Sequence, residues 1–330
     1  MSAKKKIQNR LSKNGPSSKM KQRTLKNAIH CSGTALHSGA QVSMTLHPAK
    51  PGSGIIFQRS DLSAQGASIP AHWRRVSETR LCTKLSNDEN ASVSTVEHLM
   101  AALAGCGIDN VLVEINSGEV PVMDGSAAPF VFLIECAGIV EQDAPRNLIR
   151  ILKPVSVVEE GRRASLTPAD IFSIHCEIDF KSNAVAHQSY DFQMVNGNFK
   201  SEISRARTFG FLHEVDHLRA NGLALGGSLD NAVVVSGDQI LNEDGLRYDD
   251  EFVRHKVLDT IGDLYLAGGQ IIGHFEGIHS GHALNRLLLE TLFADEEAWC
   301  LNGMAPGTAP SHATPASIGW RNDSRLLATA

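Results

Sequence analysis

Hydrophobic and polar residues alternate along residues 41–49 and 54–60, and this period-two pattern predicts two strands joined by a turn of proline, glycine and serine. Residues 94–107 and 126–138 instead carry apolar runs that end at a glycine, which is typical of helices. The apolar segment 109–116 between them predicts another strand. The first part of the folded chain is therefore expected to begin with strands and to end in the order helix, strand, helix.

The second part of the chain repeats this order. Its pattern predicts strands over 155–160, 172–180, 190–195 and 270–278 and helices over 251–269 and 281–299. In both parts a histidine stands near the start of the first closing helix, His98 in one and His255 in the other. The repeat predicts an α+β fold of two similar domains, each a sheet with a layer of helices on one face, with the active site between the domains.

The ends of the chain differ in composition from this folded part. Residues 304–330 are rich in alanine, proline, serine and threonine, and the polar stretch 141–146 separates the two repeated parts. The sequence therefore predicts the following division: a disordered basic extension over 1–20, a first α+β domain over 21–143, a second α+β domain over 144–303 with an insert around 210–237, and a flexible tail over 304–330.

The net charge of −5 hides an uneven distribution, because residues 1–60 contain 11 lysines and arginines and no aspartate or glutamate. The basic residues between Lys4 and Lys26 suit either a tether to phosphates or anionic lipid or a solubilising tail, and we favour the tail. No base-reading motif accompanies them and aromatic residues are only 5%, so we expect no nucleic-acid partner.

Composition narrows the class of protein further. With 330 residues, 42% of them hydrophobic, the chain is long enough for two buried cores. It has no unbroken apolar run of about 18 residues and no signal-peptide core at its start, so we expect a cytoplasmic protein. Its six cysteines form no Cys-x-x-Cys pair, which indicates reduced thiols rather than disulfides or a cysteine metal site.

The predicted helix 251–269 carries the strongest candidate for metal chemistry. His255, Asp259 and Asp263 are spaced four apart, so their side chains project from one face of the helix, opposite its apolar residues. Zinc hydrolases use three histidine or carboxylate ligands and keep one position open for water. His255 and Asp259 are suited to supply two of these ligands, although acidic residues exposed to water explain the spacing equally well.

A third ligand is available from the helix predicted over 94–107. Glu97 and His98 are adjacent and point in different directions, so one can bind a metal while the other holds a water molecule. Ser94 and Glu97 also fit the Ser-x-x-Glu capping box, in which Glu97 only caps its helix. Combined with the histidine and aspartate of the other helix, the pair completes a hydrolytic site of two histidines, one aspartate and a spare carboxylate.

A second metal pattern lies in residues 213–217, whose His-Glu-x-x-His sequence matches that of metalloproteases. His213, Glu214 and His217 would form this site. No third histidine follows at the required spacing, and apolar residues along one side make an amphipathic surface helix the simpler explanation. A metalloprotease is therefore the alternative enzyme, and a non-catalytic protein that docks on phosphate or membrane through its basic N-terminus is the alternative from another class.

Five segments of the chain are similar to one known family. They are STVEHLMAALAGCGIDN, PVMDGSAAPFV, ISRARTFGF, LNEDGLRYDDEFVRHKVLDTIGDLYL and SGHALN. Together they resemble the UDP-3-O-acyl-N-acetylglucosamine deacetylase family of lipid A biosynthesis, over roughly residues 20–299. The resemblance implies a zinc metalloamidase that removes acetyl from the sugar nitrogen and releases acetate and UDP-3-O-acyl-glucosamine, the committed step of that pathway.

The resemblance also implies the metal ligands. By their positions in these segments, His98, His255 and Asp259 would hold Zn²⁺ and Glu97 would be the general base. The ligand set agrees with the one that the residue types and spacing favour. The His-Glu-x-x-His sequence falls in an insert of the family that binds no metal.

Further catalytic positions follow from the same resemblance. Thr208 and Lys256 would stabilise the oxyanion of the tetrahedral intermediate. His282 would protonate the leaving amine, kept cationic by Asp263. The sequence leaves open whether Glu97 or His282 delivers this proton.

The remainder of the substrate needs other surfaces. The resemblance places Asp179 and Phe180 at the nucleotide. Because the acyl chain needs an apolar channel, its candidate residues are apolar: Phe209 and Leu36 at the mouth, and Leu212, Val215, Leu229 and Val234 in the insert. Ordinary core packing explains each of these residues equally well. We further expect a monomer that comes transiently close to a membrane.

Overall fold

The computed structural model describes residues 20–63, 66–195 and 197–302. The predicted tail 304–330 and all but the last residue of the predicted extension 1–20 lie outside the described residues. All six cysteines lie inside them and are free thiols, as the sequence indicated.

Two five-stranded sheets of the same topology form the framework. The strand order is β2-β3-β9-β4-β5 in the first sheet and β12-β13-β20-β14-β15 in the second. In each sheet the central strand, β9 or β20, pairs antiparallel with one neighbour and parallel with the other. The repeat that the sequence pattern predicted is therefore confirmed. The strands are β2 (Ile29–Thr34), β3 (Gln41–Pro48), β4 (Ile55–Arg59), β5 (Ser68–Pro70), β9 (Val111–Ile115), β12 (Val155–Glu159), β13 (Arg162–Thr167), β14 (Ser173–Asp179), β15 (His187–Gln193) and β20 (His274–Ile278).

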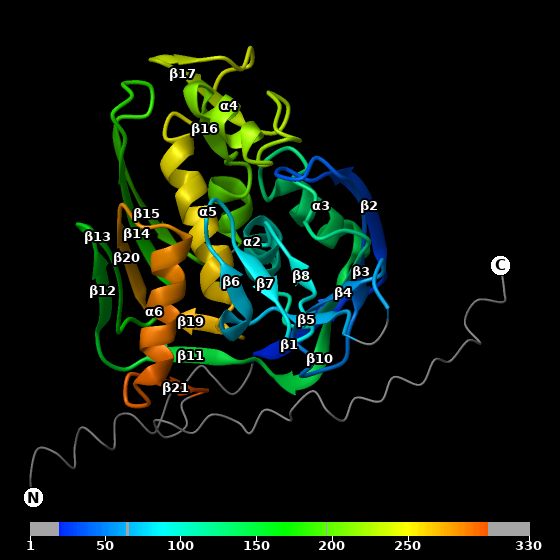
Figure 1. The fold of residues 1–330 in the computed structure, drawn as a ribbon. Helices are drawn as coiled ribbons and strands as arrows, with labels where there is room; N and C mark the ends of the chain where they lie inside the picture. The colour runs from blue at the N-terminus through cyan, green and yellow to red at the C-terminus, as the bar shows by residue number, and fades with distance from the viewer. Residues whose placement is uncertain (1–19, 64–65, 196, 303–330) are drawn as a thin grey trace, which may run out of the picture.

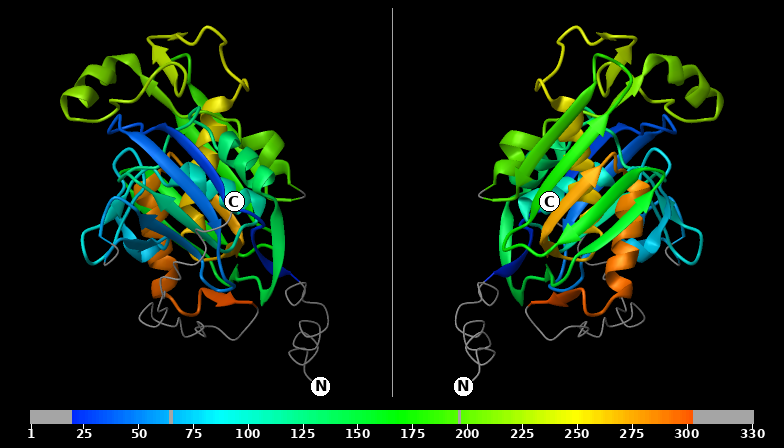
Figure 2. Two further views of the ribbon diagram at one scale, coloured as in Figure 1. Left: turned by 90° about the vertical axis from the view of Figure 1, so that its right-hand side faces the viewer. Right: turned by 90° about the vertical axis from the view of Figure 1, so that its left-hand side faces the viewer.

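Four helices occupy equivalent places in the two repeats. They are α2 (Glu97–Cys106), α3 (Ala128–Ala137), α5 (Glu251–Tyr265) and α6 (His282–Ala294). They lie between the two sheets (Figure 1), and Figure 2 shows each sheet from its outer side with helices behind it. At the centre α2 packs against α5. None of the helices in the part of the chain that the structure describes is both long and apolar enough to cross a membrane.

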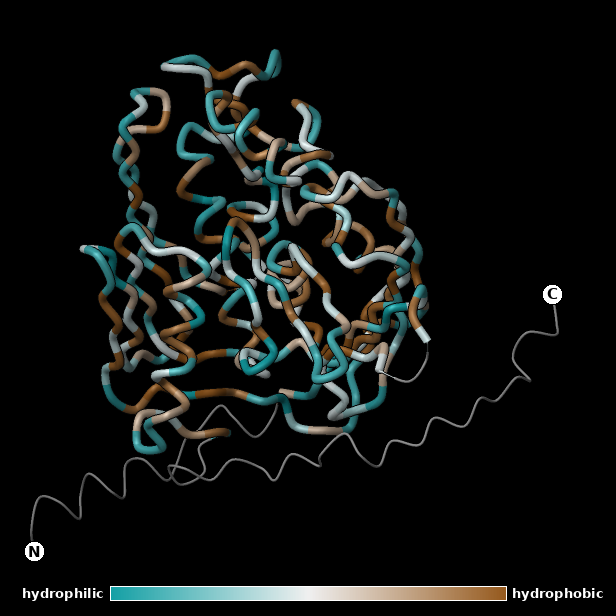
Figure 3. The backbone as a smooth tube through the Cα atoms, in the orientation of Figure 1, coloured by the Kyte–Doolittle hydropathy of each residue, from teal (hydrophilic) through white to brown (hydrophobic). Residues whose placement is uncertain are grey.

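The strands show the burial expected of sheets covered on one face. Every second residue of β3 is buried, from Val42 through Met44 to Leu46, and hydrophilic and hydrophobic positions alternate along many strands in Figure 3. Helix α5 is buried on both its apolar and its polar side, because all but two of its 15 residues are buried. Its polar face lies against α2 rather than water, so the amphipathic pattern here marks a buried site.

Smaller elements connect and flank these layers. They are the paired strands β1 (Lys21–Leu25) and β10 (Ile139–Pro145); the sheet of β6 (Val76–Glu78), β7 (Lys84–Ser86) and β8 (Ser92–Val93); the sheet of β11 (Leu148–Ile151), β19 (Gln270–Ile272) and β21 (Trp299–Leu301); the sheet of β16 (Phe209–Phe211), β17 (Val233–Ser236) and β18 (Gln239–Ile240); the short helices η2 (Trp73–Arg75) and η3 (Phe199–Ile203); and α4 (Leu212–Ala220).

Two segments form strands that the sequence pattern did not predict as such. The single strand expected over 270–278 is two strands, β19 and β20, which belong to different sheets and are separated by Gly273. A Cβ at this glycine would lie 2.6 Å from Cγ1 of Ile151, so only glycine lets the chain pass here. The polar stretch 141–146, expected as the boundary between the two repeated parts, mostly belongs to strand β10. Pairing with β1 satisfies the backbone of this strand, although none of the side chains of β10 is buried.

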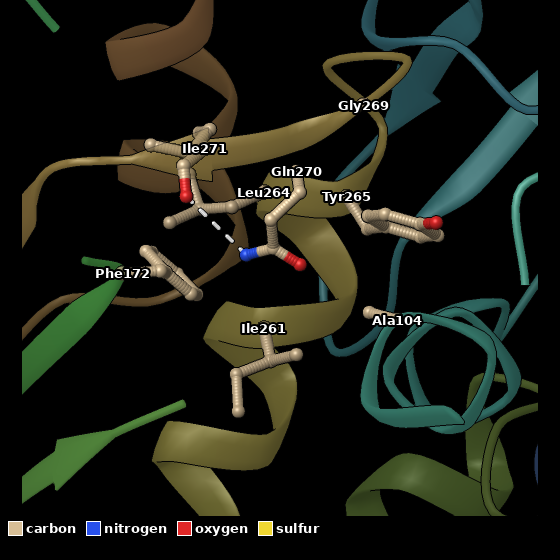
Figure 4. A pocket seen from close by; sticks show the side chains of 8 residues that line it. All are labelled: Ala104, Phe172, Ile261, Leu264, Tyr265, Gly269, Gln270 and Ile271. Carbon is tan, nitrogen blue, oxygen red and sulfur yellow. Dashed lines mark hydrogen bonds between the residues drawn. The ribbon is translucent and has the colours of Figure 1, made fainter. Parts of the chain in front are cut away.

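A small cavity lies where the end of α5 meets α2 and β19 (Figure 4). Its volume of about 10 Å³ has room for about one water molecule. Phe172, Ile261 and Leu264 give it a mainly apolar wall, and the Gln270 side chain there donates to the carbonyl of Ile271 at 3.3 Å. It contains none of the candidate ligands, so it is a packing defect beside the core and not the site.

Candidate active site

The contact between α2 and α5 brings three candidate metal ligands together. Nε2 of His98 lies 3.6 Å from Oδ1 of Asp259, and Nε2 of His255 lies 3.4 Å from the same oxygen. The two imidazole rings meet edge to face with centroids 4.9 Å apart. One ligand atom from each residue lies within 4.8 Å of the others, and all three side chains are buried.

These separations fit a shared metal ion better than direct hydrogen bonds. A tetrahedral ion with bonds of roughly 2.0–2.2 Å holds its ligand atoms roughly 3.4 Å apart. The observed contacts are of that length and too long for good hydrogen bonds between the same atoms. Among the described residues, this is the single group of histidine, cysteine and carboxylate side chains able to hold a metal ion.

A backbone carbonyl sets the orientation of the His255 ring. Its Nδ1 lies 3.1 Å from the carbonyl oxygen of Ala206, which selects the tautomer with Nε2 free to face Asp259. Burial lowers the pKa of His255 to about 4, against the opposing effect of Asp259, so the ring is neutral at pH 7 as a ligand must be. Nδ1 of His98 is buried without a hydrogen-bond partner among the described residues.

Asp259 is held as a carboxylate. Burial alone would raise its pKa, but His255 and Lys256 hold it well below the usual range. Nζ of Lys256 donates to Oδ2 of Asp259 at 2.7 Å, which leaves Oδ1 for the side of the histidines. Burial acts to lower the pKa of Lys256, but Asp259 raises it, so the ammonium stays charged.

Glu97 begins α2 and is buried, with 2% of its surface exposed. Its Oε2 accepts a hydrogen bond from the backbone N–H of Thr83 at 3.0 Å. The residue at the N-cap of the helix is Val96, and no side chain caps the helix, so the capping box considered for Ser94 and Glu97 is wrong. Burial raises the pKa of Glu97, while His282 opposes the shift. A carboxylate of raised pKa beside the candidate ligands is typical of a general base.

His282 and Asp263 form a hydrogen-bonded pair beside Glu97. Nδ1 of His282 and Oδ2 of Asp263 are 2.7 Å apart, and Nε2 of His282 lies 3.9 Å from Oε1 of Glu97. Two more donors fix the aspartate: the Thr83 hydroxyl at 2.6 Å and the Asn285 amide at 2.9 Å. Burial opposes the charge on His282, but Asp263 outweighs it and raises the pKa to about 9. The imidazole is therefore cationic at pH 7.

The loop before α2 is held in a conformation that few residues adopt. Thr95 has φ +57°, which is unusual for a β-branched residue. Its hydroxyl donates to Oε1 of Glu119 at 3.1 Å, and the same buried carboxylate accepts from the backbone N–H groups of His37 and Ser38. This network fixes the approach of the chain to Glu97, two residues further on.

Aromatic rings connect the predicted nucleotide position to the site. Phe180 is half-buried and meets Phe209 edge to face with centroids 5.6 Å apart. The ring centroids of Phe209 and His255 are in turn 6.4 Å apart. Asp179, beside Phe180, is exposed at the end of β14. Thr208, next to Phe209, is half-buried, and its backbone N–H donates to the carbonyl of Gly125 at 2.8 Å.

The candidate residues for the acyl chain lie on or beside the insert. Leu212 on α4 and Leu229 are 45% and 47% exposed, which excludes core packing as the explanation for these two. Val215 on α4 and Val234 on β17 are half-buried. Leu36 lies at the edge of this insert, because its carbonyl accepts from the N–H of Gly226 at 3.0 Å.

The His-Glu-x-x-His sequence forms the surface helix α4, which has no buried residue. His213 contacts the ring of Phe211, and His217 lies near the amide of Asn221. Within the ranges that the structure describes, neither histidine belongs to a group able to hold a metal ion.

Sequence patterns did not single out three contributors to the site. Thr83 and Asn285 hold Asp263 in place, and Ala206 orients His255 with a backbone carbonyl. Asn285 had one available signal, because it follows His282 by three residues on the same helix face. Ala206 lies in the segment ISRARTFGF, but nothing in that pattern indicates a role for its carbonyl, and Thr83 reaches the site from a distant loop.

Comparison with known proteins agrees with this geometry. The family model for UDP-3-O-acyl N-acetylglycosamine deacetylase matches residues 22–294. The chain belongs to this family. The match spans both sheets and all the candidate site residues described above.

Curated members of the deacetylase family are similar over most of their length. The UDP-3-O-acyl-N-acetylglucosamine deacetylase of Chromohalobacter salexigens is 53% identical over 284 residues, which cover 85% of this chain and 92% of that protein. The deacetylase of the same name from Idiomarina loihiensis is 53% identical over 282 residues, with the same coverage. That of Stenotrophomonas maltophilia strain R551-3 is 50% identical over 304 residues, or 90% of this chain and 99% of that protein. Membership in this deacetylase family favours an amidase over the metalloprotease and over a non-catalytic docking protein.

Proposed function

We propose that this chain is a zinc-dependent amidase that hydrolyses the N-acetyl group of UDP-3-O-acyl-N-acetylglucosamine, the committed step of lipid A biosynthesis. The products are acetate and UDP-3-O-acyl-glucosamine. One observation carries the proposal: in a chain of the deacetylase family, His98, His255 and Asp259 converge within 4.8 Å beside a buried carboxylate, Glu97, and a cationic histidine, His282.

The three converging residues are assigned as the metal ligands. Their chemistry, two imidazoles and one carboxylate, is that of catalytic zinc sites, which bind with three protein ligands. Zinc bound there would polarise the acetamide carbonyl and lower the pKa of water. The neutral His255 and the ionised Asp259 are already in the protonation states that ligation requires.

Proton transfer is assigned to Glu97 and His282. A water molecule attacks the acetyl carbon and gives a proton to the Glu97 carboxylate, which the Thr83 N–H holds in place. The carbon–nitrogen bond then breaks, and the sugar nitrogen takes the proton of His282. Acetic acid leaves with the second proton of the water molecule and ionises to acetate. The proton on Glu97 passes to His282 across the 3.9 Å between their side chains, which restores both groups.

Assignment of the amine's proton to His282 follows from its charge. Asp263 accepts from Nδ1, so the Nε2–H on the other side of the ring is the one that faces Glu97 and the reacting atoms. Glu97 has to be ionised at the start of the reaction and His282 has to be protonated. The pKa of about 9 for His282 keeps that proton in place at neutral pH.

Stabilisation of the developing oxyanion is assigned to Thr208 and Lys256. Lys256 is a permanent cation that already lies 2.7 Å from Asp259. Thr208 stands between Arg207 and Phe209, and the ring centroid of Phe209 lies 6.4 Å from that of His255. Donors fixed before the reaction stabilise the charge without reorganisation.

The nucleotide and the lipid are assigned to separate surfaces. Asp179 and Phe180 would contact the uridine, with Phe180 packed on the ring of Phe209. The acyl chain would be covered by the apolar residues at the insert, namely Leu36, Phe209, Leu212, Val215, Leu229 and Val234. The partially exposed side chains among these give an incoming lipid chain apolar area to bury. We place the enzyme in the cytoplasm as a monomer that comes transiently close to a membrane to meet its lipid-bearing substrate.

Metal removal tests the proposed reaction. After dialysis against a chelator, the protein is expected to lose acetate release from UDP-3-O-acyl-N-acetylglucosamine, because the three ligands alone cannot polarise the carbonyl. Addition of Zn²⁺ at one equivalent should restore it. Acetate is measured enzymatically, with a peptide substrate as the control for protease activity. Full activity after complete metal removal, or peptide cleavage in place of acetate release, contradicts the proposal.

The pH profile tests the roles of Glu97 and His282. The rate should fall on the acid side as Glu97 takes up a proton at its raised pKa, and on the alkaline side as His282 loses its proton near pH 9. His282→Gln should lower kcat by about 10²- to 10⁴-fold and remove the alkaline limb while the acid limb remains. The matched control is His47→Gln, which changes a surface histidine paired with Glu114 at 2.9 Å. If the alkaline limb persists unchanged in His282→Gln, another group donates the proton to the leaving amine.

A further inference from the structure

A buried ion pair lies next to the site but is not part of the catalytic set. Arg207 and Glu251 are buried, with 7% and 0% of their side chains exposed. The carboxylate accepts from Nε of Arg207 at 2.8 Å, from its Nη2 at 3.0 Å and from its backbone N at 2.9 Å, and from the backbone N of Arg247 at 2.6 Å. Burial of two charges is costly and often adds little net stability. The pair therefore needs an explanation beyond the stability of the fold.

The positions of Arg207 and Glu251 in the chain supply this explanation. Glu251 is the first residue of α5 and stands one turn before His255. Arg207 stands between Ala206, whose carbonyl lies 3.1 Å from Nδ1 of His255, and Thr208. Arg207 is thus held to Glu251 at the start of α5 by its backbone N–H and by its side chain, directly beside the residue whose carbonyl contacts His255. The guanidinium also reaches the carbonyl of Gly245 at 2.7 Å, which ties in the loop before α5.

From this arrangement we infer that the Arg207–Glu251 pair is a positioning device for the metal site: it fixes the Ala206 carbonyl that orients His255 and thereby sets the affinity for the metal. The inference rests on the proposed role of His255 as a ligand. Neither charged group is expected to touch the substrate. Loss of groups that orient a metal ligand typically weakens metal binding by about 10- to 100-fold.

The other end of the same helix offers a matched control. Arg146 and Asp109 form an equally buried pair, with 9% of each side chain exposed and 2.8 Å between Nε and Oδ1. Arg146 also reaches the hydroxyl of Tyr265, the last residue of α5. No candidate ligand or catalytic residue contacts this pair in the part of the chain that the structure describes. A change there should alter stability alone.

The experiment compares Arg207→Lys with Arg146→Lys. Lysine keeps the charge but cannot reproduce the planar fork of the guanidinium. Zn²⁺ affinity of the full chain is measured by competition with a chromophoric chelator, together with the visible spectrum of the Co²⁺-loaded protein and the melting temperature of the metal-free protein. We expect R207K to bind Zn²⁺ about 10- to 100-fold more weakly, with a changed Co²⁺ spectrum. R146K should lower the melting temperature and keep Zn²⁺ affinity within about twofold.

A double variant covers the case in which R207K does not fold. Arg207→Gln with Glu251→Gln keeps polar partners in place and leaves no unpaired buried charge. It is expected to fold and to show the same weaker binding. If either folded variant binds Zn²⁺ as tightly as the wild type while His255→Ala loses the metal, the inference is wrong and the proposed function stands. If His255→Ala itself keeps the metal, the proposed ligand set fails first.

Discussion

His255→Ala is expected to lose the bound metal and to release acetate at least about 10³-fold more slowly than the wild type. The variant retains only His98 and Asp259 of the ligand set, and two ligands do not hold a catalytic zinc ion. Metal-assisted polarisation contributes several kcal/mol to the reaction, which corresponds to this loss of rate. Metal content by elemental analysis and acetate release by a coupled assay measure the two effects.

His213→Ala is the matched control for this prediction. It also removes a histidine from a helix with a nearby carboxylate, but from the surface helix α4, which contains no buried residue. Metal content and turnover should both stay at the wild-type level. If His213→Ala instead loses the metal and His255→Ala keeps it, the assigned site is wrong and the metalloprotease pattern has to be reconsidered.

Gly262→Ala is expected to damage the site without removing any of its groups. A Cβ at this position would lie 2.0 Å from the carbonyl oxygen of Glu97 and 3.1 Å from the backbone N of Ala101. Both atoms belong to the backbone of α2, so α2 and α5 have to move apart. Because α2 carries Glu97 and His98 while α5 carries Asp259, the ligand atoms separate with the helices. Overpacking of this kind costs about 1–3 kcal/mol or more of stability, and a misplacement of about 1 Å lowers the rate by about 10²-fold.

Gly105→Ala separates overpacking from damage to the ligands. A Cβ there would lie 2.1 Å from Cδ1 of Phe199, so this change also overpacks the side of α2, but at the end of the helix far from Glu97. Both variants should melt at lower temperature than the wild type. Zn²⁺ affinity and kcat should fall in Gly262→Ala alone. Equal metal affinity in the two variants would show that the close contact at Gly262 does not set the ligand spacing.

The sequence predicted the convergence of the three candidate ligands because the relevant signals are local. The spacing of His255 and Asp259 puts both on one helix face, and the adjacent Glu97 and His98 begin the equivalent helix of the first repeat. The duplicated element order, with the active site expected between the domains, implied that these helices meet, and the packing of α2 against α5 bears this out. The family to which the chain belongs was likewise recognisable from its motifs.

The rest of the site could not be predicted because it depends on contacts remote in sequence. Thr83 stands 180 residues before Asp263, to which its hydroxyl donates, and no pattern connects the two. A polar stripe on α5 is compatible with water or with a second helix, and only packing decides between them. Gly273 breaks an apolar run into two strands because of its approach to Ile151, a constraint that the run itself does not contain.

The close pairing of α2 with α5 has a consequence for the stability of the whole chain. Each repeat contributes only part of the ligand set, so a metal ion at this seam would act as a cross-link between the two halves, in the way a disulfide joins two segments. An ion present at about 1,000 times its dissociation constant adds about 4.1 kcal/mol to the stability of the native state. We therefore expect the metal-free protein to be cleaved by proteases faster than the metal-bound protein, in addition to losing its turnover. Local unfolding should begin where the two halves meet.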